Sequence, residues 1–223
     1  IGTGAIGVEF AYFYHSMGCE VTLVEFLPNI MPREDVDVSK ELEKIYKKKG
    51  LSIMTNASVE KVTLGKHGCD VEIKTAAGIE KKSADIVLSA VGIQANIENI
   101  GLEDLGVKTE KGKIVVDGYY QTSVPGIYAI GDVIDTPALA HVASAEGITC
   151  VEKIAGMHVE TIDYSNIPGC TYCSPEIASV GMTEKEAKEK GYELKVGKFP
   201  FSASGKASAA GAKDGFVKMT KVS

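Results

Sequence analysis

The sequence opens on IGTGAIG, in which glycine occupies positions 2, 4 and 7. This G-x-G-x-x-G spacing restricts the fold strongly, because it is typical of a tight turn that leads from a strand into a helix. An apolar stripe at helical steps follows, and Gly18 is placed to end that helix; the stripe consists of Ile6, Phe10, Phe13 and Met17. The next segment, EVTLVEF, has the β-branched content of a strand. The pattern therefore predicts a parallel α/β unit.

The three glycines and the end of the strand suggest a dinucleotide. Gly2 would permit the tight turn, Gly4 would let the backbone approach a pyrophosphate, and Gly7 would let the helix pack closely. Glu25 follows 21 positions after Gly4, where such folds place the acid that binds the adenosine ribose. A carboxylate there repels a 2′-phosphate, and FLPNIMP after it carries no cation, so NAD is favoured over NADP. The alternative is a glycine-rich turn with a hydrogen-bonded surface glutamate.

The glycine pattern normally follows a strand, but only Ile1 precedes it here. The last strand-like segment, GFVKMTKVS, ends with the sequence. We therefore expect a fragment of a longer protein, one that begins inside its first β–α–β unit.

The next segments continue the α/β pattern. DVDVSKELEKIYKKKG predicts a helix whose Val38, Leu42 and Ile45 face inward, and LSIMT predicts a parallel strand. Alternation of period two between residues 58 and 84 then suggests a β-meander. DIVLSAVG is apolar throughout and predicts a buried parallel strand. Gly92 would end it at the carboxyl edge of the sheet, where ligands bind, although a simple strand-ending turn explains this glycine equally well.

The second half of the sequence has short strands separated by glycine. IYAIGD predicts a brief strand that delivers Asp132 at its end. PALAHVASAEGITCVEKIAG predicts a helix with small residues on one face, which suit a close neighbour or a cofactor. Its N-terminus would point N–H donors at whatever lies beside Asp132. From residue 162 two strands, a helix opened by the capping box Thr183–Glu186 and two further strands suggest an antiparallel α+β unit.

Composition excludes several classes of protein. Lys and Arg number 24 against 30 Asp and Glu, and the net charge of −6 argues against nucleic acid as a partner. The sequence contains no run of about 18 apolar residues, so no membrane-spanning segment is predicted. Five scattered cysteines do not resemble a secreted disulfide framework, so we expect a reducing cytosol.

Two of the cysteines, Cys170 and Cys173, form a Cys-x-x-Cys that invites a redox or metal-binding interpretation. Both lie in a predicted strand, where side chains three positions apart point to opposite faces. A zinc site would need a second pair at ligand spacing, and the other cysteines and histidines offer none. We therefore expect no active site and no metal here.

Four segments, in order and spacing, resemble the pyridine nucleotide–disulfide oxidoreductases. They are GTGAIGVEFAYFYHSMGCEVTLVE, TSVPGIYAIGD, LAHVASAEGITCVEKIAG and CTYCSPEIASVG. Within that family the likeness is to the dihydrolipoamide dehydrogenase branch, and it covers essentially the whole chain. The resemblance implies an α/β fold: a Rossmann-like NAD-binding domain over 1–95, a second FAD-binding segment over 96–161, and the start of a dimerisation domain over 162–223.

The resemblance also assigns residues to the cofactors. The NAD pyrophosphate loop and helix start would be Gly2, Thr3, Gly4, Ala5, Ile6, Gly7, Val8 and Glu9. Glu25 would hold the ribose, and Val59 and Gly92 would line the rest of the groove. Glu9 would also pair with a lysine near the flavin, unless it is simply solvated. Asp132 would hold the ribityl side of FAD. The start of the helix after it would stabilise negative charge on the reduced flavin ring. That start comprises Ala138, Leu139, Ala140 and His141, with His141 a backbone contact.

The implied activity carries electrons from dihydrolipoamide, on a lipoyl domain of a 2-oxoacid dehydrogenase complex, through a disulfide and FAD to NAD. The implied protein is a homodimer of the bacterial cytoplasm or mitochondrial matrix. The family's first FAD domain, its Cys-x4-Cys and its C-terminal His-Glu pair do not appear in this sequence, so we expect the chain alone to be inactive. Alternatives are a glutathione or mercuric reductase, an NADH oxidase or peroxidase, and a non-catalytic NAD-binding module.

Overall fold

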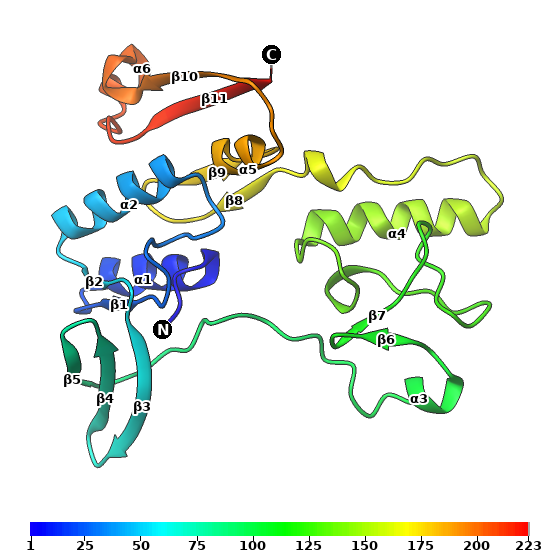
Figure 1. Ribbon diagram of the computed structural model, residues 1–223, viewed down its shortest axis with the longest axis horizontal. Helices are drawn as coiled ribbons and strands as arrows, with labels where there is room; N and C mark the ends of the chain where they lie inside the picture. The colour runs from blue at the N-terminus through cyan, green and yellow to red at the C-terminus, as the bar shows by residue number, and fades with distance from the viewer. Residues whose placement is uncertain (223) are drawn as a thin grey trace. The chain divides into compact units, whose positions relative to one another are not determined.

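The computed structural model describes residues 1–222, which form two compact units (Figure 1). Unit 1 combines Ile1–Gly92 with Pro168–Ser223, and unit 2 is Ile93–Ile167. Each unit has its own core, because the buried clusters draw their residues from one unit or the other. Among the residues described, no helix has both the length and the apolar character that crossing a bilayer requires.

The first part of unit 1 has the predicted order of helix, strand, helix and strand. The elements are α1 (Ala5–Ser16), β1 (Thr22–Val24), α2 (Val36–Lys49) and β2 (Ser52–Met54). β1 and β2 pair in parallel, with Leu23 opposite Ile53. α2 starts at the N-cap Asp35, whose side chain accepts from Asp37 N, and ends at Gly50 in the left-handed conformation. The predicted parallel α/β unit is confirmed.

The predicted meander is also present. β3 (Ser58–Gly65), β4 (Gly68–Thr75) and β5 (Gly78–Ala84) form a three-stranded antiparallel sheet in sequence order. Its buried side chains make a cluster with the end of β1; the cluster consists of Val24, Ala57, Val71 and Ile73. The meander therefore packs close to β1, which ends immediately before Glu25.

α1 is helical as its periodicity predicts, but the apolar stripe does not face the core. Ile6, Phe10, Phe13 and Met17 are 43–70% exposed, whereas Gly7, Val8 and Ala11 form the buried face. Gly7 lies on this face where the helix meets the glycine loop, since a Cβ atom there would lie 2.1 Å from Gly2 O. Periodicity therefore identified the helix without identifying its buried side.

The expectation of a buried strand over 85–92 is wrong. The structure assigns no strand there, and Ile86 and Val91 are 80% and 74% exposed. Ile1 N donates to Leu88 O at 2.8 Å, and Ala90 N donates to Ile1 O at 2.7 Å. Among the described residues, these two hydrogen bonds both go to Ile1. An apolar segment becomes a buried strand only where neighbouring strands cover it.

The last part of unit 1 has the predicted antiparallel strands and capped helix. β8 (Gly169–Thr171) pairs with β9 (Ile177–Ser179), and β10 (Leu194–Pro200) pairs with β11 (Phe216–Val222). α5 (Glu184–Glu189) begins with the predicted capping box of Thr183 and Glu186. A short 3-10 turn, η3 (Phe201–Ala203), and α6 (Gly205–Ala209) connect β10 to β11.

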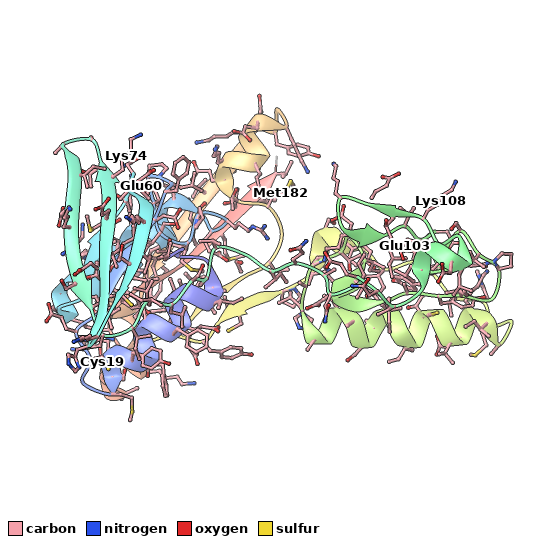
Figure 2. The ribbon with its side chains drawn as sticks, turned by 90° about the horizontal axis from the view of Figure 1, so that it is seen from below. Cys19, Glu60, Lys74, Glu103, Lys108 and Met182 are labelled. Atoms are coloured by element: carbon pink, nitrogen blue, oxygen red, sulfur yellow. The ribbon has the colours of Figure 1, made fainter. Side chains whose placement is uncertain are left out.

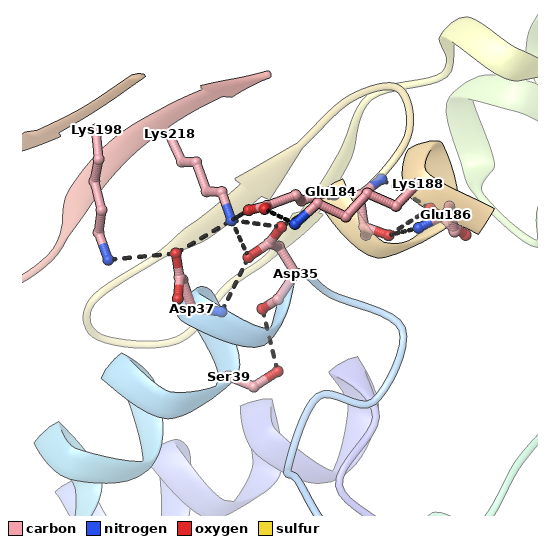
Figure 3. A network of polar contacts seen from close by, with 9 residues as sticks. Asp35, Asp37, Ser39, Glu184, Glu186, Lys188, Lys198 and Lys218 are labelled. Carbon is pink, nitrogen blue, oxygen red and sulfur yellow. Dashed lines mark hydrogen bonds and ion pairs between the residues drawn. The ribbon is translucent and has the colours of Figure 1, made fainter. Parts of the chain in front are cut away.

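A cluster of charges ties β11 to the start of α2 (Figure 3). Lys218 Nζ lies 2.8 Å from Asp35 Oδ1, 3.1 Å from Asp37 Oδ2 and 2.7 Å from Glu184 Oε2. The lysine side chain is only 7% exposed. Because Asp35 also caps α2, one carboxylate serves both the helix and the connection to β11.

Unit 2 contains short elements around one long helix. The elements are α3 (Leu102–Leu105), β6 (Thr109–Glu110), β7 (Lys113–Ile114), η1 (Gly131–Val133), α4 (Ala140–Ile154) and η2 (Tyr164–Asn166). Ile134, Tyr120 and Cys150 lie in its core, while Glu103 and Lys108 lie on its outside (Figure 2). The predicted strand over IYAIGD is wrong, because the segment makes only one isolated bridge, between Gln121 and Tyr128, and forms no ladder. The core holds this extended segment before η1 against α4.

Candidate functional site

The first and third glycines of the opening loop are required by the packing of the protein itself. A Cβ atom on Gly2 would lie 2.5 Å from Ala90 O, and Gly2 has a φ of +86°. A Cβ atom on Gly7 would lie 2.1 Å from Gly2 O. A side chain at Gly2 would therefore push the loop away from the segment that follows the meander, and a side chain at Gly7 would push α1 away from the loop.

Gly4 differs from both, because nothing in the protein requires it to be glycine. Its φ of −66° and ψ of −176° suit any residue, and a Cβ atom there would meet nothing within 4 Å. Gly4 is also the N-cap of α1, and no side chain caps that helix. The N–H groups of the first helical turn have no partners within the helix, so the open space at Gly4 suits an anionic group.

Glu25 is buried and bound to the glycine loop. It is 6% exposed; its Oε2 accepts from Thr3 N at 2.9 Å and Thr3 Oγ1 at 2.6 Å, and its Oε1 accepts from Leu27 N at 2.8 Å. A carboxylate offers about four lone-pair positions, so about one remains for another donor. Glu25 does not lie on the surface, as the alternative assumed, but it is hydrogen-bonded within the protein as that alternative expected. Its ribose role stays a prediction, and the role of Thr3 as its anchor was not foreseen.

The loop after Glu25 is pinned to the same site. Met31, with a φ of +47°, donates from its N–H to Thr3 O at 2.9 Å. The Ser39 hydroxyl, in α2, donates to Met31 O at 3.1 Å. Sequence reasoning missed both residues, because a methionine in the left-handed region and a serine inside a helix carry no local signal of this contact.

Of two other residues predicted to line the NAD groove, one lies in the meander and the other ends the first segment of unit 1. Val59 is half-buried in β3 and packs against the cluster of Val24, Ala57, Val71 and Ile73. Gly92 has a φ of +148° and open space around it. The backbone conformation alone accounts for glycine at 92, so the roles of Val59 and Gly92 stay predictions.

Glu9 has a partner that the sequence did not suggest. Its Oε1 accepts a hydrogen bond from Tyr172 N at 2.8 Å, which joins α1 to the residue after β8. Glu9 is therefore not merely solvated in unit 1. Its pairing with a lysine near a flavin stays a prediction.

In unit 2, the residues predicted to contact a flavin lie in one stretch. Asp132 is exposed in η1, and its carbonyl accepts from Lys113 Nζ. α4 begins at Ala140 after the N-cap Leu139, with no side-chain cap, and Ala138 and His141 are exposed beside it. Thr136 Oγ1, between them, is buried and is the one side-chain polar atom in the described residues that is both buried and without a hydrogen bond. A carboxylate, an uncapped helix start and an unpaired hydroxyl suit the polar edge of a cofactor.

The small-residue face of α4 contacts the protein. A Cβ atom on Gly131 would lie 3.2 Å from Ala143 Cβ, and one on Gly147 would lie 3.2 Å from Ile130 Cδ1. Of the two readings, a close neighbour or a cofactor, the structure supplies a neighbour for Ala143 and Gly147. That neighbour is the segment Ile130–Gly131, which precedes Asp132.

Sequence reasoning missed a buried glutamate on the same helix. Glu146 is 0% exposed; its Oε2 accepts from Gly131 N at 2.6 Å and its Oε1 accepts from the Tyr164 hydroxyl at 2.9 Å. Burial and the hydrogen bonds to Tyr120 and Glu146 raise the pKa of Tyr164. The available signal was spacing, since Glu146 lies four residues from the buried Val142 and four from the buried Cys150.

Cys170 and Cys173 are free thiols in different environments. Cys170 is exposed, whereas Cys173 lies two residues beyond β8, is 4% exposed and places its Sγ 3.1 Å from Pro175 O. Burial raises the pKa of the Cys173 thiol, which reduces the thiolate population. The expectation that both cysteines lie in one strand is wrong, because β8 ends at Thr171 and Cys173 lies in a bend. That the two thiols do not act as a pair stays a prediction.

Two family models match the chain. The model of pyridine nucleotide-disulphide oxidoreductases matches residues 1–147, and the model of the dimerisation domain of the same proteins matches residues 167–222. Among curated proteins, the chain is 52% identical over 221 residues to a dihydrolipoyl dehydrogenase of Rhizobium etli, a match that covers 98% of this chain and 46% of that protein. A dihydrolipoyl dehydrogenase of Zymomonas mobilis is 49% identical, with 98% and 47% covered.

Solved structures agree with this fold. The flavoprotein disulfide reductase RclA of Escherichia coli matches with a TM-score of 0.91 and 27% identity, over 100% of this chain and 51% of that one. LpdA of Mycobacterium tuberculosis matches with a TM-score of 0.89 and 27% identity, over 100% of this chain and 48% of that one. The chain spans about half the length of the curated relatives that it matches. It belongs to the pyridine nucleotide–disulphide oxidoreductase family.

Proposed function

We propose that the chain is the NAD-binding portion of a flavin-dependent dihydrolipoyl dehydrogenase. The observation that carries this proposal is the open, uncapped helix start at Gly4, where glycine has no purpose within the protein. A pyrophosphate that touches the backbone would give it one. Identities of 52% and 49% to dihydrolipoyl dehydrogenases, against 27% to RclA, favour this branch over other flavoprotein reductases.

The proposed NAD site extends from the glycine loop along unit 1. Residues 2–9 would hold the pyrophosphate, and Glu25 would accept from a ribose hydroxyl with the lone-pair position that its three donors leave. Val59 and Gly92 would line the remaining groove. NAD rather than NADP is the proposed coenzyme, because a buried carboxylate that is already hydrogen-bonded has no means to compensate a 2′-phosphate.

The proposed flavin contacts lie in unit 2. When bound, FAD supplies the capacity to take two electrons from a dithiol and to pass them to NAD as hydride. The Asp132 carboxylate would accept hydrogen bonds from ribityl hydroxyls, and the uncapped start of α4 at Ala138–His141 would stabilise negative charge. The unpaired Thr136 hydroxyl supports a polar ligand in the same stretch.

The proposed reductant is dihydrolipoamide on a lipoyl domain of a 2-oxoacid dehydrogenase complex, and the proposed assembly is a cytoplasmic homodimer. The relatives' names support the reductant, and the dimerisation-domain match supports the homodimer. The division into 1–95, 96–161 and 162–223 and the inactivity of the chain alone stay predictions.

Titration with NADH tests the NAD site directly. We expect saturable binding, followed by nicotinamide fluorescence, with NADPH at least tenfold weaker. Gly4→Ala should lower the NADH affinity at least tenfold and leave the stability unchanged, because alanine fits the protein at that position. Gly197→Ala in β10 is the matched control, since Gly197 also has open space around it and no positive φ. Equal NADH binding by Gly4→Ala and wild type would refute the proposed site.

The visible absorption spectrum tests the flavin contacts. A flavin spectrum that bleaches on addition of NADH would support a flavin-linked enzyme. A colourless chain that binds NADH would restrict the function to NAD binding.

A further inference from the structure

Glu146 places a buried carboxylate against the turn that carries Asp132. The hydrogen bond from Gly131 N to Glu146 Oε2 is 2.6 Å long, short for a bond from a backbone N–H. The other oxygen is occupied by the Tyr164 hydroxyl at 2.9 Å, and the Tyr164 and Tyr120 hydroxyls are 3.0 Å apart. Both oxygens of the Glu146 carboxylate therefore accept hydrogen bonds from groups of unit 2.

Packing alone does not require a carboxylate at this position. The contact between α4 and the segment Ile130–Gly131 is already made by small residues, as the close approaches at Ala143 and Gly147 indicate. Burying a carboxylate is unfavourable unless it forms hydrogen bonds, and a side chain such as leucine or methionine carries no such requirement. The carboxylate adds a hydrogen-bond acceptor for one particular group, the Gly131 N–H.

The turn at Gly131 and Asp132 is held on several sides. Ile134 N donates to Gly131 O at 3.0 Å, and Lys113 Nζ contacts Asp132 O. Gly131 has a φ of +73°, and a Cβ atom there would meet Ala143. Glu146 fixes the one remaining backbone group of Gly131, its N–H, while the Asp132 side chain stays exposed.

We propose that Glu146 is a positioning residue for Asp132. Oriented by Tyr164, its carboxylate holds the Gly131 N–H and so sets the direction in which the next residue presents its own carboxylate to the flavin. This inference rests on the proposed flavin role of Asp132. Neither Glu146 nor Tyr164 touches the ligand, and both act through Gly131.

Backbone amide NMR on the isotope-labelled chain tests the contact without any flavin. In Glu146→Ala we expect the Gly131 amide to exchange with solvent at least tenfold faster, and the Asp132 signals to shift. Glu146→Gln keeps an acceptor and should restore Gly131 protection to within threefold, with an upfield shift of its amide proton because a neutral acceptor is weaker. Glu152→Gln, on the same helix, is the control and should change neither signal.

The pattern of changes separates positioning from a general structural role. Positioning predicts changes at residues 131 and 132, while the amides of α3, β6 and β7 keep their exchange rates. Uniformly faster exchange across unit 2, or a wild-type rate at Gly131 in folded Glu146→Ala, would overturn the inference. If Glu146→Ala does not fold, Glu146→Gln decides, and an unchanged Gly131 amide proton shift in that variant would overturn it.

Titration with FAD, followed at the Asp132 amide, separates this inference from the proposed function. We expect the affinity for FAD to fall at least fivefold in Glu146→Ala. An affinity equal to wild type, despite a displaced Asp132, would overturn the positioning role. No response to FAD in either protein would refute the flavin site itself, while the contact measured without flavin would stand as a separate result.

Discussion

Replacing Lys218 by methionine should destabilise unit 1 far more than a typical surface substitution does. The lysine ammonium lies 2.8 and 3.0 Å from the two oxygens of Asp35 and 3.1 Å from Asp37 Oδ2. Methionine keeps most of the aliphatic chain, so the change removes the charge with little loss of packing. It leaves neighbouring carboxylates facing one another without the cation between them.

The expected magnitude follows from burial. Breaking a buried ion pair from one side costs roughly 3–5 kcal/mol, whereas exposed pairs contribute about 0–1 kcal/mol. The side chains of Lys218 and Asp35 are 7% and 14% exposed, but Asp37 is 37% exposed and its contribution is screened by solvent. We therefore expect a loss of about 2–4 kcal/mol in the free energy of unfolding of unit 1.

Urea unfolding followed by NMR is the suitable assay, because the chain has no tryptophan and its two units need separate signals. The amide of Tyr46, in the core of unit 1, reports on that unit. Lys221→Met, also in β11 but exposed, is the matched control and should change stability by less than about 0.5 kcal/mol. Asp35→Asn keeps an N-cap side chain, so a double-mutant cycle with Lys218→Met isolates the charge interaction. Equal stability of Lys218→Met and Lys221→Met would refute the reasoning.

Three further predictions concern the same unit. Burial alone would raise the pKa of Asp35, but its hydrogen bonds, with that of Lys218 foremost, lower it. The stability that these bonds contribute is therefore present above about pH 4 and is lost as pH falls through the lowered pKa. Urea midpoints measured from pH 6 to pH 2 should therefore become equal in wild type and Lys218→Met at the acid end. Gly2→Ala should cost about 2 kcal/mol or more, measured by the same urea assay, because a Cβ atom would lie 2.5 Å from a backbone carbonyl at a φ of +86°. A thiol reagent should label Cys170 rapidly and Cys173 only slowly, as peptide mapping would reveal, and equal rates would contradict the buried position of Cys173.

The elements that the sequence predicts well are those with local determinants. The glycine loop, α1, α2 and the capping box at Thr183 and Glu186 each depend on residues a few positions apart. The meander follows from alternation and short turns, which are also local. Such patterns fix the type of an element without reference to the rest of the chain.

Contacts between distant segments were the ones that sequence reasoning missed. The exposed stripe of α1 and the exposed segment 85–92 differ from expectation because burial depends on neighbouring layers, which periodicity does not describe. Likewise, the bonds from Thr3 to Glu25 and from Gly131 to Glu146 join residues 22 and 15 positions apart. The sequence therefore predicts a set of candidate site residues, but it did not indicate the side chains that hold Glu25 and Gly131 in place.

The burial of Glu25 has a consequence for how coenzyme preference could change. The carboxylate proposed to reject a 2′-phosphate is also the acceptor for both donors of Thr3 and for Leu27 N. A substitution that admits NADP by removing this charge would leave three buried or half-buried donors unpaired at the entrance to the glycine loop. A switch of coenzyme would therefore need a compensating acceptor, either in the same substitution or in a second change nearby, so that the loop keeps its hydrogen bonds while the charge is lost.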